Sequence, residues 1–296
     1  AGDERDFGKN AILHFRNYIC QWVAVQEVVP SNTGERMTED SAGTGDFVFR
    51  YGPSALVTGA SSGIGRSFAR LLAEAGLDLI LVARRLDRLE ELAAELRCRH
   101  GVEVTVHEVD LSDPAAVDRL LEQEATTDIG LLVSNAGFGV KGPFEDGDTA
   151  TLAAMLAVNC QAPTRLAHAL VPRLRRRGRG GVVFTSSVEG LLGCPYSAAY
   201  SATKAYVNAL GEGLWGELTP AGIDVLTLCP GATDTEAPRL QGIDPATLRH
   251  LMDPDDVARG ALENLNNGPT YVPSEHYRAQ FDTLVTMPRR QALAAM

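Results

Sequence analysis

The fold of this chain is decided by residues 54–65, which read SALVTGASSGIG. The first five residues form a short apolar run typical of a buried strand, and an amphipathic helical pattern begins at Arg66. Gly59 would permit a tight turn, Gly63 a close approach of the backbone to a pyrophosphate, and Gly65 close packing of helix on strand. A helix start also offers free N–H groups and a positive dipole end to phosphates. The stretch therefore predicts a dinucleotide site at this turn.

On the carboxyl side of this turn, short apolar runs alternate with helical patterns. The candidate strands cover residues 54–58, 77–83, 102–109, 129–134, 181–186, 223–229 and 270–272. The helical patterns between them cover residues 66–75, 86–99, 114–123, 149–176, 197–218 and 253–265. Apolar strands that are each followed by a helix are typical of a parallel sheet covered on both faces. We expect a single α/β domain over residues 46–296, with a doubly wound parallel sheet of the Rossmann type and about seven strands.

Residues 1–45 form an N-terminal extension with a different pattern. Apolar residues recur at helical spacing from Ala11 to Val28, which predicts an amphipathic helix. The polar stretch Ser31 to Gly45 is typical of a flexible linker. The helix could pack on its own domain or on a neighbouring subunit, whereas a membrane-surface role is less favoured because its polar face carries few cations.

Composition excludes several classes of function. The 296 residues carry a formal net charge of −11, which argues against a nucleic-acid partner. No run approaches the roughly 18 apolar residues of a membrane span, and the N-terminus lacks a secretory signal pattern. The five cysteines and six histidines show no metal-ligand spacing. We therefore expect a soluble, cytoplasmic protein with no metal site, and 45% hydrophobic residues are enough to form a core.

The residues after the second candidate strand bear on the choice of dinucleotide. This strand ends at Ala83, and Arg84 and Arg85 follow. A carboxylate there would accept hydrogen bonds from the ribose of NAD, whereas a cation favours the 2′-phosphate of NADP. One charged hydrogen bond of about 1.5–3 kcal/mol gives a preference of about ten- to hundredfold. The arginines could instead pair with Asp87 or Glu90 at a solvated helix start, but we expect NADP(H) in preference to NAD(H).

A second group of residues suggests the chemistry. Tyr200 and Lys204 lie four apart in a helical pattern, so they share one face on successive turns. The glycine spacing G-x-x-x-G-x-G differs from that of most dinucleotide folds, and residues 58–65 match T-G-x-x-x-G-I-G. The sequence here resembles the short-chain dehydrogenase/reductase family. The resemblance implies a catalytic tetrad of Asn159, Ser187, Tyr200 and Lys204, which occur in the family's order and at about its spacing.

The resemblance also implies a role for each member of the tetrad. Tyr200 would be the acid/base, and an adjacent ammonium is expected to lower its pKa from about 10 toward the working pH. Lys204 would bond the nicotinamide ribose, Ser187 would orient the carbonyl, and Asn159 would hold a water in a proton relay. Taken singly, each residue has a structural alternative. Ser187 could cap a strand end, and Asn159 could make a hydrogen bond within its helix. Tyr200 could be a packed aromatic, and Lys204 a surface charge.

Further matches place the cofactor along the strand ends. Asp110 matches the position that contacts adenine, although it could equally cap the helix that begins near Pro114. The backbone near Ala232 and Thr233 would meet the nicotinamide carboxamide, with Thr235 beside it. The resemblance covers residues 46 to about 275. It implies these cofactor-binding residues: Gly59, Ser61, Ser62, Gly63, Ile64, Gly65, Arg84, Arg85, Asp110, Asn135, Ala136, Gly137, Tyr200, Lys204, Pro230, Gly231, Thr233 and Thr235.

We thus expect an NADP(H)-dependent oxidoreductase that interconverts a carbonyl and an alcohol. Substrate selection should lie in residues 138–140, 188–196 and 236–252, and the last segment is typical of a mobile lid. Its apolar side chains favour a hydrophobic small-molecule substrate, although they could simply anchor the lid. The alternatives are epimerisation or dehydration at the same site, or an NADP-binding sensor or interaction module without turnover. The resemblance also implies a homo-oligomer, a dimer or a tetramer.

Overall fold

A computed structural model describes residues 44–241 and 243–295. The chain divides into two units, residues 1–41 and 42–296. The amphipathic helix and the linker expected in residues 1–45 lie outside the described residues, apart from the last two positions of the linker.

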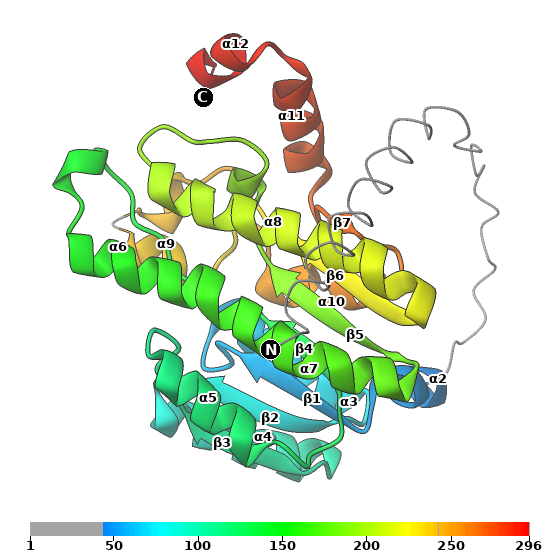
Figure 1. Ribbon diagram of the computed structural model, residues 1–296. Helices are drawn as coiled ribbons and strands as arrows, with labels where there is room; N and C mark the ends of the chain where they lie inside the picture. Colours follow the sequence, from blue (N-terminus) through cyan, green and yellow to red (C-terminus); the bar gives the residue numbers. More distant parts are fainter. Residues whose placement is uncertain (1–43, 242, 296) are drawn as a thin grey trace, which may run out of the picture. The chain divides into compact units, whose positions relative to one another are not determined.

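The second unit is built on a seven-stranded parallel sheet with the order β3-β2-β1-β4-β5-β6-β7 (Figure 1). The predicted doubly wound sheet is confirmed, and every predicted strand lies within two residues of an observed one. The strands are β1 (Ser54–Thr58), β2 (Asp78–Ala83), β3 (Val104–Glu108), β4 (Ile129–Ser134), β5 (Gly180–Thr185), β6 (Ile223–Leu228) and β7 (Thr270–Tyr271).

Helices connect the strands and extend beyond the last one. They are α2 (Thr44–Tyr51), α3 (Gly63–Glu74), α4 (Leu86–His100), α5 (Pro114–Gln123), α6 (Thr149–Leu156), α7 (Ala162–Arg177), α8 (Ala198–Leu218), α9 (Glu236–Leu240), α10 (Pro254–Glu263), α11 (Glu275–Thr286) and α12 (Arg289–Ala294). Short 3-10 turns are η1 (Phe144–Asp146), η3 (Val188–Gly190), η4 (Thr219–Ala221) and η5 (Pro245–Thr247), and η2 (Ala157–Gln161) is a π turn. The sequence did not predict α2, α11 or α12. None of the described helices is long and apolar enough to cross a membrane.

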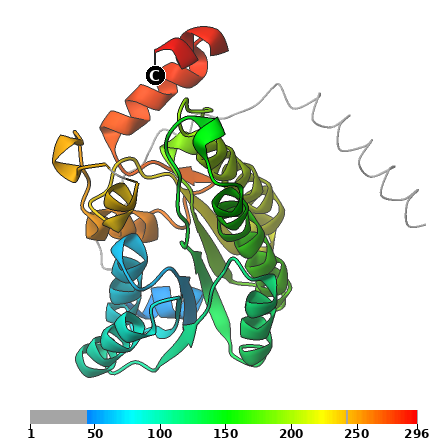
Figure 2. The ribbon, with the colours of Figure 1, turned by 90° about the vertical axis from the view of Figure 1, so that its left-hand side faces the viewer.

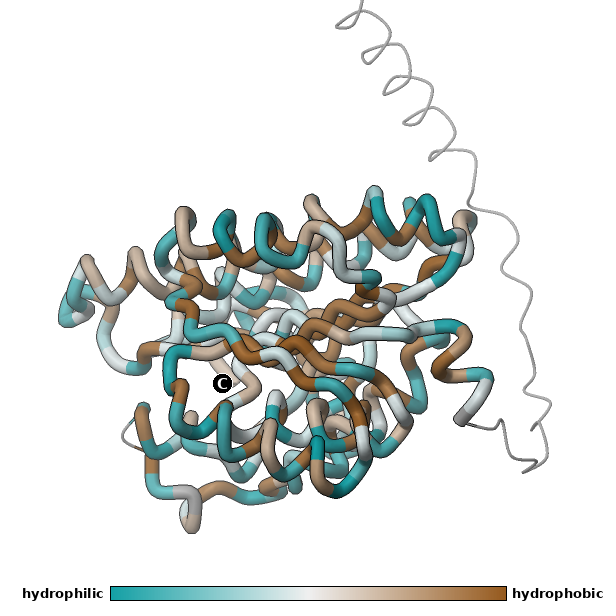
Figure 3. Tube along the Cα trace, turned by 90° about the horizontal axis from the view of Figure 1, so that it is seen from below, coloured by the Kyte–Doolittle hydropathy of each residue, from teal (hydrophilic) through white to brown (hydrophobic). Residues whose placement is uncertain are grey.

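Two hydrophobic layers enclose the sheet, one on each face. Side chains of α3, α4 and α10, such as Phe68, Leu89 and Val257, pack on one face. Side chains of α5, α7 and α8, such as Leu166 and Val207, pack on the other. Figure 2 shows the sheet between these two helix layers, and Figure 3 shows apolar residues concentrated along the central strands. The continuous apolar strands are explained by burial on both faces.

Helix α2 is anchored at the end of the sheet where the strands begin. The Arg50 guanidinium donates two hydrogen bonds to Asp224 of β6, at 2.6 and 2.8 Å. The buried Tyr51 hydroxyl donates a third at 2.7 Å. A Cβ at Gly130 of β4 would lie 2.4 Å from the Tyr51 carbonyl oxygen, so glycine is needed there. Helix α2 is therefore part of the domain core.

The helix expected over residues 149–176 is interrupted. Helices α6 and α7 are separated by the π turn η2, and Asn159 lies within it. The Asn159 side chain donates to the Phe138 carbonyl oxygen and to the Thr203 hydroxyl, both at 2.9 Å, and accepts from the Phe138 N–H at 3.1 Å. These bonds tie the turn to the β4 loop and to α8. π turns inside α-helices occur frequently at functional sites.

Candidate active site

The glycine turn after β1 has the geometry of a phosphate cradle. Gly59 and Gly63 have φ angles of 69° and 52°, in the left-handed region that favours glycine. A Cβ at Gly65 would lie 2.3 Å from the Gly59 carbonyl oxygen, so α3 approaches the turn as closely as predicted. The Ser62 side chain makes no hydrogen bond to the first turn of α3, which leaves that turn's N–H groups without its cap. The cradle fits a dinucleotide phosphate.

The ends of β1 and β4 are joined beside this turn. The Thr58 hydroxyl accepts from the backbone N–H groups of Asn135 and Ala136, both at 3.0 Å. The Asn135 amide donates to the Thr58 carbonyl oxygen at 3.1 Å. The strand order reverses between β1 and β4, and ligands of open parallel sheets bind at such a switch point.

The two arginines after β2 differ in their surroundings. Arg85 donates to the hydroxyls of Ser61 and Ser62 at 3.0 and 2.8 Å, and to the Glu236 carboxylate at 2.7 Å. These are its partners in place of Asp87 or Glu90, the pairing considered as an alternative. Arg84 is exposed. The Arg85 side chain therefore lies directly over the glycine turn.

Asp110 does not cap the helix that follows it. The carboxylate accepts from the N–H and the hydroxyl of Ser112, at 2.9 and 2.7 Å, and these bonds lower its pKa, with a smaller contribution from the charge of Arg84. The cap of α5 is Asp113, which accepts from the Ala115 N–H at 2.9 Å. The capping alternative for Asp110 is therefore wrong, because Asp113 sits one residue before the helix.

The four tetrad residues come together beyond the ends of β4 and β5. Tyr200 and Lys204 lie on successive turns of α8, and the Lys204 ammonium is 5.7 Å from the centre of the Tyr200 ring. It donates to the Thr185 carbonyl oxygen of β5 at 2.8 Å. A Cβ at Gly137 would lie 3.1 Å from both the Asn159 Oδ1 and the Lys204 Nζ, so this glycine leaves room for the two polar groups.

Burial shifts the pKa values of both titratable members of the tetrad. It lowers the pKa of Lys204 to about 8. It also raises the pKa of Tyr200, as does the negative charge of Glu189, while the nearby Ser187 hydroxyl acts in the opposite direction. The expected lowering of the Tyr200 pKa is therefore not seen in the structure without cofactor, where desolvation of the phenolate is the largest effect.

A charged pair beside Tyr200 was not singled out from the sequence. The Lys141 ammonium lies 2.5 Å from a Glu189 oxygen and 5.7 Å from the centre of the Tyr200 ring. The Ser197 hydroxyl donates to the other Glu189 oxygen at 2.6 Å. Both charges fall in or next to segments expected to select substrate. The position of Glu189, two residues after Ser187, was the signal that could have identified it.

The predicted nicotinamide loop follows β6 and contacts the Ser187 loop. The Pro230 carbonyl oxygen accepts from the Val188 N–H at 3.1 Å and from the Ser187 hydroxyl at 3.5 Å. Thr235 caps α9 and packs against Gly63, where a Cβ would lie 2.9 Å from its methyl group. This loop thus reaches the glycine turn on one side and the tetrad on the other.

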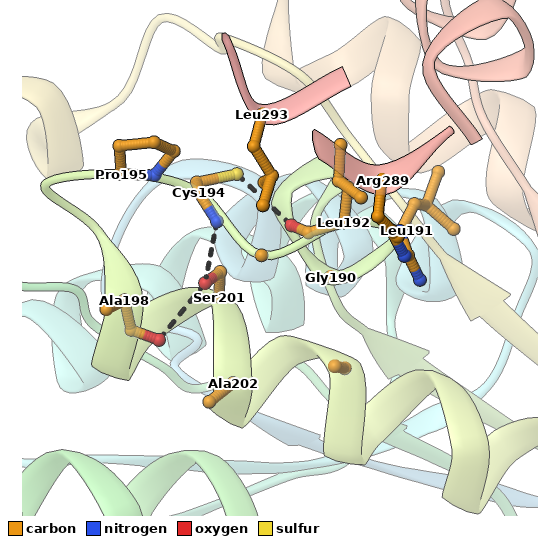
Figure 4. A pocket seen from close by; sticks show the side chains of 12 residues that line it. Gly190, Leu191, Leu192, Cys194, Pro195, Ala198, Ser201, Ala202, Arg289 and Leu293 are labelled. Carbon is orange, nitrogen blue, oxygen red and sulfur yellow. Dashed lines mark hydrogen bonds between the residues drawn. The ribbon is translucent and has the colours of Figure 1, made fainter. Parts of the chain in front are cut away.

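The C-terminal helices cover the loops on the substrate side. The ring of Tyr277 in α11 packs on Gly231, where a Cβ would lie 2.2 Å from it. Val188 and Leu192 form a third hydrophobic cluster with α11 and α12. Figure 4 shows a cavity of about 480 Å³ between this loop, α8 and α12. Among the described residues its lining includes neither Tyr200 nor Lys204, so the cavity lies on another side of α8 from the tetrad.

Comparison with known proteins agrees with this geometry. Residues 53–242 match the family model described as short chain dehydrogenase. The chain belongs to the short-chain dehydrogenase/reductase family. A 7beta-hydroxysteroid dehydrogenase of Clostridium sardiniense is 32% identical over 252 residues, covering 85% of this chain and 97% of that protein.

Two solved structures support the assignment. A short-chain dehydrogenase from Sphingobium yanoikuyae in complex with NADPH has a TM-score of 0.74 and 38% identity, covering 82% of this chain and 95% of its own. The bulky-bulky ketone specific alcohol dehydrogenase from Comamonas testosteroni has a TM-score of 0.69 and 34% identity, covering 83% of this chain and 94% of its own. As a short-chain dehydrogenase/reductase, the chain is a nicotinamide-dependent oxidoreductase that acts on CH–OH and C=O groups.

Proposed function

We propose that the chain is an NADP(H)-dependent oxidoreductase that interconverts a hydrophobic ketone or aldehyde and its alcohol, with Tyr200 as acid/base. The observation that carries the proposal is the assembly of Asn159, Ser187, Tyr200 and Lys204 beside the glycine turn, at the switch point of the sheet. A nicotinamide bound there supplies or accepts the hydride.

The protein's own residues would supply the proton that the carbonyl oxygen takes up during reduction. Burial and the charge of Glu189 keep the Tyr200 phenol protonated at neutral pH, which suits a donor to the oxygen of a carbonyl that is being reduced. A Lys204 pKa of about 8 lets the ammonium release and regain a proton near working pH, which an arginine could not do. Asn159, whose side-chain oxygen lies near Gly137 as the Lys204 ammonium does, would hold a water that relays this proton.

Preference for NADP(H) is supported by the arginines after β2. Arg85 is held over the glycine turn by Ser61 and Ser62, and the adjacent Arg84 is exposed. A guanidinium recognises a phosphate through two parallel charged hydrogen bonds. The structural relative from Sphingobium yanoikuyae was solved with NADPH.

A hydrophobic substrate is supported by the surroundings of Ser187 and by the relatives. Val188 and Leu192 are buried against α11 and α12, so the loop after Ser187 has an apolar setting. The relatives named above include a hydroxysteroid dehydrogenase and an alcohol dehydrogenase specific for bulky ketones. A panel of hydrophobic ketones and aldehydes is therefore the first set of substrates to assay.

Replacing Tyr200 by Phe tests the acid/base assignment. We expect NADPH oxidation with a ketone panel to fall by about 10³-fold or more, because the proton donor is lost while the ring remains. NADPH binding, measured by fluorescence titration, should stay within about twofold of the wild-type value, since the phenol is not the main cofactor contact.

The matched control is Tyr206→Phe, on the same helix. Tyr206 is 44% exposed and its hydroxyl contacts Thr164, away from the tetrad. Turnover in this control should be unchanged. Substantial turnover by the Tyr200→Phe variant would remove Tyr200 from its proposed role. A wild-type chain that binds NADPH but turns over nothing in the panel would instead favour a sensor.

A further inference from the structure

The start of α4 places positive charge where a helix disfavours it. Arg84, Arg85 and Arg88 lie at the N-terminus of α4, and Arg85 is the N-cap but makes no side-chain capping bond. Unpaired N–H groups already give a helix N-terminus a partial positive charge, so cations there are unfavourable and anions are stabilising. Asp87 in the first turn offsets part of this charge, and an anion between the guanidiniums stabilises the arrangement further.

In the described structure that anion is the carboxylate of Glu236, the first residue of α9. One oxygen accepts from Arg85 Nη1 at 2.7 Å, and the other accepts from Arg88 Nη1 at 2.5 Å. A single carboxylate thus bridges two guanidiniums, as two oxygens of a phosphate group would. The two arginines lower the pKa of Glu236 to about 2, so the bridge is charged at any working pH.

The remaining contacts of Arg85 are to the cofactor cradle. Its Nη2 donates to Ser61 and Ser62, so Nη1 is the part of the guanidinium that faces away from the glycine turn. The Glu236 carboxylate accepts a hydrogen bond from that Nη1. A phosphate in the place of the carboxylate would bind Arg85 and Arg88 together.

The segment that carries Glu236 is attached in a way that permits this exchange. It leaves the sheet and returns to it at one short bridge between Thr233 and Met252. The Asp234 N–H donates to the Met252 carbonyl oxygen, and the Met252 N–H donates to that of Ala232, both at 2.9 Å. The Glu236 side chain is 38% exposed. It can therefore move without breaking the strand contacts of the core.

We propose that Glu236 is an internal competitor for the 2′-phosphate of NADP(H), and that Arg88 is a second phosphate ligand beside Arg85. The inference rests on the proposed preference for NADP(H), and it identifies Glu236 as a residue that determines how strong this preference is. Glu236 neutralises the arginines in the free chain and yields to the phosphate when the cofactor binds. NAD(H) has no 2′-phosphate and does not need the exchange.

Binding titrations of the Glu236→Gln variant with NADPH and NADH test the proposal. We expect the Kd for NADPH to fall by about three- to tenfold, because a neutral amide competes less well for two guanidiniums. The Kd for NADH should change by less than about 1.5-fold. Asp234 and Glu236 both line a cavity of about 190 Å³, but Asp234 pairs with Arg239 at 3.6 Å, so Asp234→Asn is the matched control. This control should leave both affinities unchanged.

Each result bears on one of the two proposals. A weaker affinity of Glu236→Gln for NADPH would overturn the competition and make Glu236 part of a clamp over the bound cofactor. An equal gain in affinity for NADPH in Asp234→Asn would also overturn the competition. The cause would then be the loss of any negative charge in this region. The ratio of the wild-type Kd values for NADH and NADPH separately tests the cofactor preference. A ratio near one would refute that preference, while tightening by Glu236→Gln alone would still support competition.

Discussion

At the scale of single residues, the buried ammonium of Lys204 lowers the stability of the free chain. Its side chain is nearly inaccessible, and burial lowers its pKa from 10.5 to about 8. The unfolded chain therefore binds more protons than the folded chain between about pH 8 and 10.5, and stability rises with pH across that window. Below about pH 8 the whole cost of burying the charge is present, about 3 kcal/mol for a shift of this size.

Lys204→Met should therefore stabilise the chain while abolishing turnover. The gain at pH 7 should be about 2 kcal/mol, since the hydrogen bond to the Thr185 carbonyl oxygen, worth about 1 kcal/mol, is lost. The gain should shrink toward pH 10, where the wild-type amine is neutral in the folded state. Urea denaturation at pH 7 and pH 10 without cofactor measures it. A variant that is destabilised equally at both pH values would contradict the argument.

At the scale of elements, α2 is attached to β6 through Asp224. Tyr51→Phe should lower the free energy of unfolding by about 1 kcal/mol, because one hydrogen bond to a partly buried carboxylate is lost while both bonds from Arg50 remain. Turnover should be unchanged, since α2 lies at the opposite end of the sheet from the tetrad. Urea denaturation measures the effect, with Tyr196→Phe as the control because Tyr196 is 71% exposed. Equal stability of the two variants would show that the Tyr51 hydroxyl contributes nothing to the docking of α2.

The elements that sequence analysis predicted best are those with the simplest pattern. The central strands β1, β2, β4, β5 and β6 are short and mainly apolar because both faces of the sheet are buried there, whereas the edge strands β3 and β7 are partly exposed. Helix α11 was missed because it buries little more than Phe281 and Leu284, which gives only a weak period. The π turn at Asn159 was missed because one extra residue in a turn leaves no mark on hydrophobic spacing.

The candidate site also has features that could be predicted from the sequence and features that could not. The glycine turn could be predicted from its place between a strand and a helix, and the four residues that the family resemblance implies as the tetrad do lie close together in the fold. The bridge from Arg85 to Glu236 could not, since the two residues are 151 positions apart and only the folded chain brings them together. The raised pKa of Tyr200 depends on burial, which spacing alone does not reveal.

At the scale of the whole molecule, residues 42–296 contain the sheet, both hydrophobic layers and every proposed site residue. Removal of residues 1–41 should therefore leave the Tm within about 3 °C and kcat/KM within about twofold of the full chain, because every core residue that the structure describes is kept. Calorimetry and steady-state kinetics of the two chains check this. A loss of turnover at unchanged Tm would assign the extension a part in the site. The homo-oligomer remains a prediction, and sedimentation of both chains would test it.

The switch point between β1 and β4 also bears on how long the protein lasts in a cell. The glycine turn and Arg85 lie on one side of the joint that Thr58 makes with Asn135, and the tetrad lies on the other. A dinucleotide bound across the joint holds both halves of the sheet, adding about 2.7 kcal/mol to the free energy of unfolding at a hundred times its Kd. Proteases act on the transiently open chain, so its degradation slows when cofactor is plentiful. Abundance of the enzyme should therefore follow the cell's supply of its own cofactor.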